Sequence, residues 1–391
     1  MSVHQSSESN QSQNIKKPKS KPMTSRQLVL MILLITLPIN LIHSPSDIVL
    51  FGRQHAYLCI LIVYLVVIFS IWLLSRTQRR FGEKNIFQAM IIRFPVIGRM
   101  VVVLYILYYF FILTRDARIM SDYVDTTLLA RTPIMVILFS IFIMSGYIIR
   151  GGMKSIVGMA EIFIPIMVLV ILTLPFFVSG ELDFHYLKPF FPVDIKRVAE
   201  GSWYYFSFAG EAVILPFILG KASFNMKAAM KGVSFSLLLC VMHVIMMILI
   251  LGLPIIPRLT YPSFELVRQV QISDFLDRFD MFLAATMLPT HMTKIAFDIY
   301  VVCYGIGSLT KNMSGRMMQG PVILLAYVCA FWFFKDSVQV FNFDREWVLI
   351  TLFFIFVMPV LIFLFVRPTK KKKKKKSEKT LGHTAGSASG T

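Results

Sequence analysis

The stretch SFAGEAVILP occupies residues 207–216 and lies inside a long apolar segment of the chain. Gly210 permits backbone angles that other residues resist, and Pro216 cannot donate a helical hydrogen bond. Glu211 follows the glycine directly, and a carboxylate at the centre of a bilayer costs roughly 2.5 to 3.5 kcal/mol on insertion scales. The stretch therefore predicts a membrane helix that is broken at a functional site.

The rest of the chain has the composition of a membrane protein. Of its 391 residues, 56% are hydrophobic and 16% are charged, and the mean hydropathy is +0.70. Soluble domains are less apolar than this. The net charge of +19 could suggest a nucleic-acid partner, but the basic residues fall in short connectors between apolar segments, where membrane topology explains them. No catalytic motif or cofactor motif is present, so we expect neither an enzyme nor a cofactor.

Ten apolar segments divide the chain and predict an all-α membrane domain over residues 25–367. The segments are 26–43, 57–75, 100–123, 133–149, 156–178, 198–219, 228–256, 275–306, 321–334 and 347–366. All of them except 321–334 have a length that can span the hydrocarbon core. We expect residues 1–24 and the lysine-rich residues 368–391 to be disordered.

Basic residues gather in every second connector, which orients the ten segments. Cytoplasmic loops carry an excess of lysine and arginine, so both ends of the chain are expected in the cytoplasm. This division assigns Arg115, Asp116, Arg118 and Asp122 to an outer connector. The lysine run at 370–376 is either a topological signal or a site for anionic lipid.

Ten segments can form two inverted five-helix repeats, in which the first helix of each repeat is interrupted. The sixth segment contains the stretch quoted above. The first contains Thr36, Pro38 and Asn40 and ends at Ser44-Pro45, but it has no glycine. Freed backbone groups at such breaks can bind a ligand, whereas the alternative for Pro38 is an ordinary proline kink.

Four charged residues remain inside the segments by this division: Glu161, Glu211, Lys294 and Asp298. We hypothesise a Glu161–Lys294 ion pair, with separate hydration of the two charges as the alternative. Asp298 lies four residues after Lys294, where a pair along one helix would neutralise both. Glu211 could bind a proton, a cation or a substrate ammonium group.

Several motifs together resemble the B subunits of spore germinant receptors, which are similar to amino acid–polyamine–organocation permeases. They are the start Ser25-Arg26-Gln27-Leu28, the segment Leu128 to Pro133, Ala160-Glu161 with Pro165, Phe206 to Glu211 with Pro216, and Lys294-Ile295. The resemblance implies a LeuT-like fold with broken first and sixth helices. It also implies a receptor for a small germinant, often an amino acid, that works with an A subunit and a C lipoprotein in the inner spore membrane.

The same resemblance implies a ligand site at the middle of the membrane. Its residues are Thr36, Pro38, Asn40, Tyr108, Ser207, Phe208, Ala209, Gly210, Glu211, Ala296 and Tyr300. The alternative function is a proton- or cation-coupled amino acid transporter, with Glu211 or the region of Glu161 and Lys294 as the coupling site. Fold alone does not separate the two functions.

Overall fold

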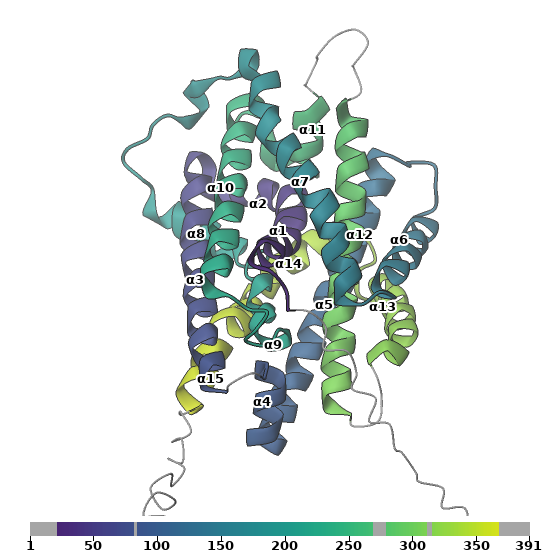
Figure 1. Ribbon diagram of the computed structural model, residues 1–391. Helices are drawn as coiled ribbons and strands as arrows, with labels where there is room; N and C mark the ends of the chain where they lie inside the picture. Colours follow the sequence, from purple (N-terminus) through teal and green to yellow (C-terminus); the bar gives the residue numbers. More distant parts are fainter. Residues whose placement is uncertain (1–21, 82–83, 269–278, 311–314, 367–391) are drawn as a thin grey trace, which may run out of the picture.

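The computed structural model describes residues 22–81, 84–268, 279–310 and 315–366, and all regular elements in these ranges are helical (Figure 1). The expected disordered segments, 1–24 and 368–391, lie outside the described residues except for residues 22–24. The lysine run at 370–376 lies outside them as well.

Each predicted apolar segment has a helical counterpart in the structure. In chain order these are α1 (Ser25–Ile42), α3 (Ala56–Arg80), α5 (Pro95–Thr127), α6 (Ile134–Ile149), α7 (Met153–Phe177), α8 (Ile195–Tyr205) with α9 (Leu215–Ile218), α10 (Met226–Leu251), α12 (Phe279–Leu309), α13 (Gln319–Phe333), and α14 (Ser337–Leu352) with α15 (Met358–Phe365). Eight helical stretches of the described residues are long and apolar enough to cross a membrane, while α6 is shorter and the sixth segment is split. The prediction of an all-α, multi-pass membrane protein is confirmed.

The first segment is broken, but later than expected. Helix α1 begins with a capping box at Thr24 and runs through Pro38 without interruption to Ile42. The break comes at His43, after which α2 (Ser44–Gly52) begins with Pro45 in its first turn. Pro45 has no N–H to donate to the carbonyl of Leu41, and the hydroxyl of Ser263 on α11 (Pro262–Arg268) donates to that carbonyl instead.

The sixth segment breaks where the sequence predicts. Helix α8 ends at Tyr205, Gly210 adopts a left-handed conformation with φ of 91°, and a short 3₁₀ turn (Glu211–Ile214) leads into α9. A Cβ atom at Gly210 would collide with the side chain of Ile355. Glycine is required here for both backbone angle and space.

Ile355 belongs to a π-helical turn, Phe353–Val357, which joins α14 to α15. Turns of this kind leave irregular backbone hydrogen bonding and occur often at functional sites. Tyr105 on α5 donates its hydroxyl to the carbonyl of Phe354 at 3.1 Å. The tenth segment thus packs its irregular turn against the break in the sixth.

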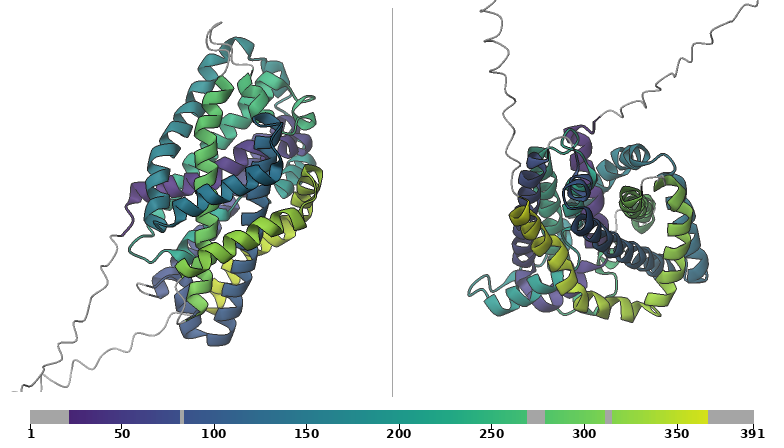
Figure 2. Two further views of the ribbon diagram at one scale, coloured as in Figure 1. Left: turned by 90° about the vertical axis from the view of Figure 1, so that its right-hand side faces the viewer. Right: turned by 90° about the horizontal axis from the view of Figure 1, so that it is seen from below.

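Helix α12 occupies the middle of the bundle and packs against α5, α6, α7 and α1. Seen from below, it is viewed nearly end-on, in green, with other helices around it (Figure 2). Helix α1 packs along α10, and α3 packs against α10, α8 and α15. Helix α12 therefore meets both α5 and the first broken helix, α1.

Candidate functional site

A cluster of five charged side chains lies at the centre of the bundle, and all five are at most 3% exposed. Helix α5 contributes Arg115 and Asp116, the 3₁₀ turn after the break contributes Glu211, and α12 contributes Lys294 and Asp298. We call these five residues the central network. Their burial favours ion pairing within the network, because an isolated charge in a low-dielectric interior is costly.

Arg115 connects α5 to the broken sixth helix. Its Nη2 lies 3.0 Å from Glu211 Oε1, and its Nη1 donates to the carbonyl of Ser207 at 3.0 Å. Its Nε donates to Asp116 Oδ1 at 2.9 Å. One guanidinium thus binds a freed backbone carbonyl and two carboxylates, which its planar fork of donors suits.

Lys294 connects α12 to the same carboxylates. Its Nζ pairs with Asp116 Oδ2, lies 2.8 Å from Glu211 Oε2 and lies 2.9 Å from Asp298 Oδ2. Glu211 is therefore held from two sides, by Arg115 on α5 and by Lys294 on α12. The hydroxyl of Tyr109 donates to the backbone carbonyl of Glu211 at 2.6 Å and fixes the turn as well.

The central network contains more acids than bases. Two cations face three carboxylates, so the fully ionised cluster carries one excess negative charge. Asp298 is its least compensated member: it pairs with Lys294 alone, and its Oδ1 has no hydrogen-bond partner among the described residues. The network can accommodate one proton or one ligand cation without gaining net positive charge.

The two broken helices meet beside this network. Asn40 Nδ2 donates to the carbonyl of Phe208 at 3.2 Å and to that of Thr36 at 2.5 Å. The ring of Phe208 lies edge-on to His43, with 5.4 Å between ring centroids, and 6.0 Å from the guanidinium carbon of Arg115. The carbonyls freed in the sixth segment are thus bound by side chains of α1 and α5.

The structure brings part of the predicted ligand set together. Asn40, Ser207, Phe208 and Glu211 are joined through the contacts above, with Ala209 and Gly210 between them in the chain. Thr36 is buried beside them and hydrogen-bonds Ser236 at 2.7 Å. Pro38 lies within the continuous part of α1.

The other predicted ligand residues, Tyr108, Tyr300 and Ala296, lie in aromatic or apolar surroundings. The ring of Tyr108 stacks on Phe354, with 4.3 Å between centroids, and so belongs to the packing around the π turn. Tyr300 stacks on Tyr304 at 5.8 Å. Ala296 is fully buried on α12.

The hypothesis of a Glu161–Lys294 ion pair is wrong. Lys294 is paired with Asp116, Glu211 and Asp298, whereas Glu161 is half-buried on α7 and forms no ion pair within the described ranges. Three carboxylates from α5, the helix break and α12 already surround the ammonium group. The pairing of Lys294 with Asp298 along one helix is confirmed.

The assignment of Arg115, Asp116, Arg118 and Asp122 to an outer connector is also wrong. All four are buried in α5, which continues to Thr127. Their charges are balanced locally, since Arg118 Nε lies 3.3 Å from Asp122 Oδ2 on the same helix. The available signal was that these four residues lie inside the predicted segment 100–123 and consist of two bases and two acids, which can neutralise each other.

Comparisons with known proteins agree with this architecture. A family model described as "Spore germination protein" matches residues 22–340. The chain is 29% identical to the putative spore germination protein YfkT of Bacillus subtilis (strain 168), over 85% of this chain and 93% of that protein. It is 24% identical to spore germination protein KB of the same organism, over 56% of this chain and 61% of that protein.

Among solved structures, the chain is similar to Mhp1, a nucleobase-cation-symport-1 family transporter in a closed conformation with bromovinylhydantoin bound. The TM-score is 0.57 at 14% identity, and the match covers 89% of this chain and 80% of Mhp1. This similarity shows a shared LeuT-like transporter fold.

Proposed function

The chain belongs to the spore germination protein family, and from this membership we propose that it is the permease-like subunit of a nutrient germinant receptor. A small germinant binds at the middle of the membrane, where the two broken helices meet the central network. Binding shifts an equilibrium between two arrangements of the helices, and partner subunits respond to that shift. A ligand does this only if it binds one arrangement more tightly than the other.

The observation that carries this proposal is that Glu211, at the helix break, is bound at once by Arg115 and Lys294. These contacts join the broken sixth helix to two continuous helices, α5 and α12. Rearranging the network would therefore move α5, α12 and the break relative to one another. Packed interfaces of this kind tend to switch between discrete arrangements of the helices.

The chemistry of the network favours an amino acid as the germinant. A free amino acid carries a carboxylate and an ammonium group, and these complement the guanidinium of Arg115 and the carboxylate of Glu211. The ligand would replace the internal Arg115–Glu211 pair with two charge-assisted contacts of its own.

The family membership also favours assembly with an A subunit and a C lipoprotein in the inner spore membrane, with both ends of the chain in the cytoplasm. Copurification from spore membranes tests this assembly. A tagged chain that recovers both partner types supports it, and a tagged chain that migrates alone under mild detergent contradicts it.

A second candidate function is a proton- or cation-coupled amino acid transporter. The excess carboxylate of the central network favours it, because a coupling site must bind a cation in one state and release it in another. The transporter fold is compatible with either function.

Uptake by the purified chain in phosphatidylglycerol-containing vesicles separates the two functions. Each of the twenty amino acids is supplied in labelled form, with and without an imposed proton or sodium gradient. Saturable binding without concentrative uptake supports the receptor, and gradient-driven accumulation supports the transporter. Binding of none of the twenty would overturn both.

A further inference from the structure

A groove of about 510 Å³ lies between α6 and α13, away from the central network. Its volume is within the range of ligand pockets, about 300–1,000 Å³. Most of its wall is apolar or aromatic, formed by Phe139, Phe142, Ile143, Ile323, Leu324 and Tyr327. Gly146 forms part of the floor, where Ile323 approaches so closely that a Cβ atom would touch it at 3.0 Å.

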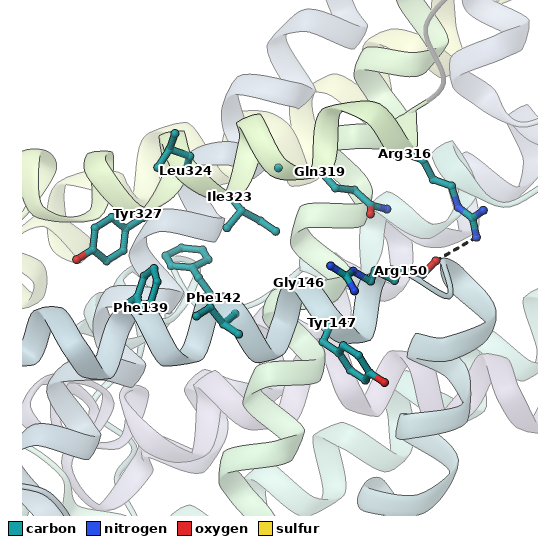
Figure 3. Close-up of a pocket in the computed structure, with 12 residues that line it drawn as sticks. Phe139, Phe142, Gly146, Tyr147, Arg150, Arg316, Gln319, Ile323, Leu324 and Tyr327 are labelled. Atoms are coloured by element: carbon teal, nitrogen blue, oxygen red, sulfur yellow. Dashed lines mark hydrogen bonds between the residues drawn. The ribbon is translucent and has the colours of Figure 1, made fainter.

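One end of the groove is strongly basic. Arg150 and Arg316 lie there with Gln319 and Tyr147, whereas Phe139, Leu324 and Tyr327 lie at the opposite end (Figure 3). Arg316 Nη2 donates to the backbone carbonyl of Arg150 at 3.0 Å, so the two arginines are held together. Within the described ranges, neither guanidinium is paired with a carboxylate.

The apolar part of the groove is open on the outer surface of the membrane helices α6 and α13. Phe139 and Leu324 are 55% and 67% exposed, on helices that belong to the ten apolar segments. The surrounding medium there is hydrocarbon. Both arginines belong to connectors that the distribution of basic residues assigns to the cytoplasmic face, where anionic lipids are concentrated.

We propose that this groove binds one anionic phospholipid, with an acyl chain between α6 and α13 and the phosphate between Arg150 and Arg316. Guanidinium groups bind phosphate oxygens in a bidentate manner, and basic pockets between membrane helices suit anionic head groups. A long apolar wall with two arginines at one end, neither of which is paired with a carboxylate of the described residues, matches a lipid better than it matches a soluble anion.

The groove is connected to the functional site through α6. Ser145, next to Gly146 on the floor, donates its hydroxyl to the carbonyl of Met292 on α12 at 3.0 Å. Met292 precedes Lys294 of the central network by two residues. A lipid that fixes the spacing of α6 and α13 would also fix this contact with α12.

The test measures lipid binding and needs no germinant, so its outcome is independent of the proposed function. Detergent-purified chain is titrated with phosphatidylglycerol or phosphatidylcholine, and retained lipid is counted by native mass spectrometry while the melting temperature is recorded. We expect one phosphatidylglycerol to be retained and to raise the melting temperature, with phosphatidylcholine at least tenfold weaker.

The double variant Arg150→Ala/Arg316→Ala should lose at least tenfold in phosphatidylglycerol affinity. Lys154→Ala/Lys227→Ala, which removes two exposed basic residues outside the groove, should retain it. Arg150→Lys/Arg316→Lys keeps the charge and should bind phosphatidylglycerol with intermediate affinity. This variant serves as the test if the double alanine variant fails to fold.

Two results would overturn the proposal. Equal retention of phosphatidylglycerol by the double alanine variant and the wild type would mean that the arginines do not bind the head group. The groove would then be a contact surface for a partner subunit instead. Competition by inorganic phosphate or short-chain phosphatidylglycerol at equal affinity would mean that the apolar wall does not bind an acyl chain.

Discussion

The ammonium group of Lys294 and the carboxylate of Glu211 lie 2.8 Å apart in the fully buried centre of the bundle. This ion pair joins α12, the central continuous helix, to the break in the sixth segment. Breaking a buried pair by removing one partner leaves an uncompensated charge and costs about 3 to 5 kcal/mol. The pair is therefore a structural constraint on the helix break, next to the Arg115–Glu211 pair that we propose the germinant replaces.

Replacing Lys294 with methionine should destabilise the protein strongly. Three carboxylates would then face Arg115 alone, and the melting temperature of the purified chain should fall well below that of the wild type. Adding Asp298→Asn to Lys294→Met removes one of the stranded carboxylates and should recover part of the loss. A double variant that melts no higher than Lys294→Met would contradict the charge-balance account.

Asp298→Asn alone should be the best tolerated change in the central network. It leaves two cations and two carboxylates, and it affects the one acid that pairs only with Lys294. We expect its melting temperature to equal or exceed that of the wild type. A loss as large as that of Lys294→Met would show that Asp298 is needed for more than charge.

Gly210→Ala should lower the free energy of unfolding by about 1 to 3 kcal/mol, because a left-handed backbone and a collision with Ile355 act together. Gly158→Ala on α7 is the matched control, since a Cβ atom there meets nothing within 4 Å. Thermal unfolding of both variants measures the difference. Similar melting temperatures for the two would mean that the break does not require glycine.

Ser263→Ala should cost about 1 to 3 kcal/mol, because it leaves the carbonyl of Leu41 without the donor that replaces the missing N–H of Pro45. The control is Ser140→Ala, which removes an exposed hydroxyl bonded within its own helix. Denaturant or thermal unfolding compares the two. If the Ser140 variant lost as much stability, the first break would not depend on Ser263.

Hydropathy and loop charge were sufficient to predict the helical architecture, because twenty apolar residues have few alternatives to spanning a bilayer as a helix. The glycine and the acid at 210–211 were sufficient to locate the second break. The first break was misplaced because Pro38 is tolerated within α1, whereas Pro45, which follows His43 by two residues, begins a new helix.

The central network could be predicted only in part. Glu211, Lys294 and Asp298 were identified by their position in apolar segments, but their partners Arg115 and Asp116 were assigned to a connector by the same charge rule that oriented the helices. That rule treats charge near a segment end as exposed. It cannot anticipate a 33-residue helix that carries balanced charges through the bundle centre.

Ligand binding by Glu211→Gln tests the central claim most directly. Affinity for the amino acid that binds the wild type is measured in vesicles, with Glu161→Gln as the control because it makes the same change at a half-buried membrane carboxylate outside the network. We expect Glu211→Gln to lose at least tenfold in affinity, about 1.4 kcal/mol, while Glu161→Gln binds as the wild type does. Wild-type affinity in a folded Glu211→Gln protein would contradict the placement of the germinant at this helix break.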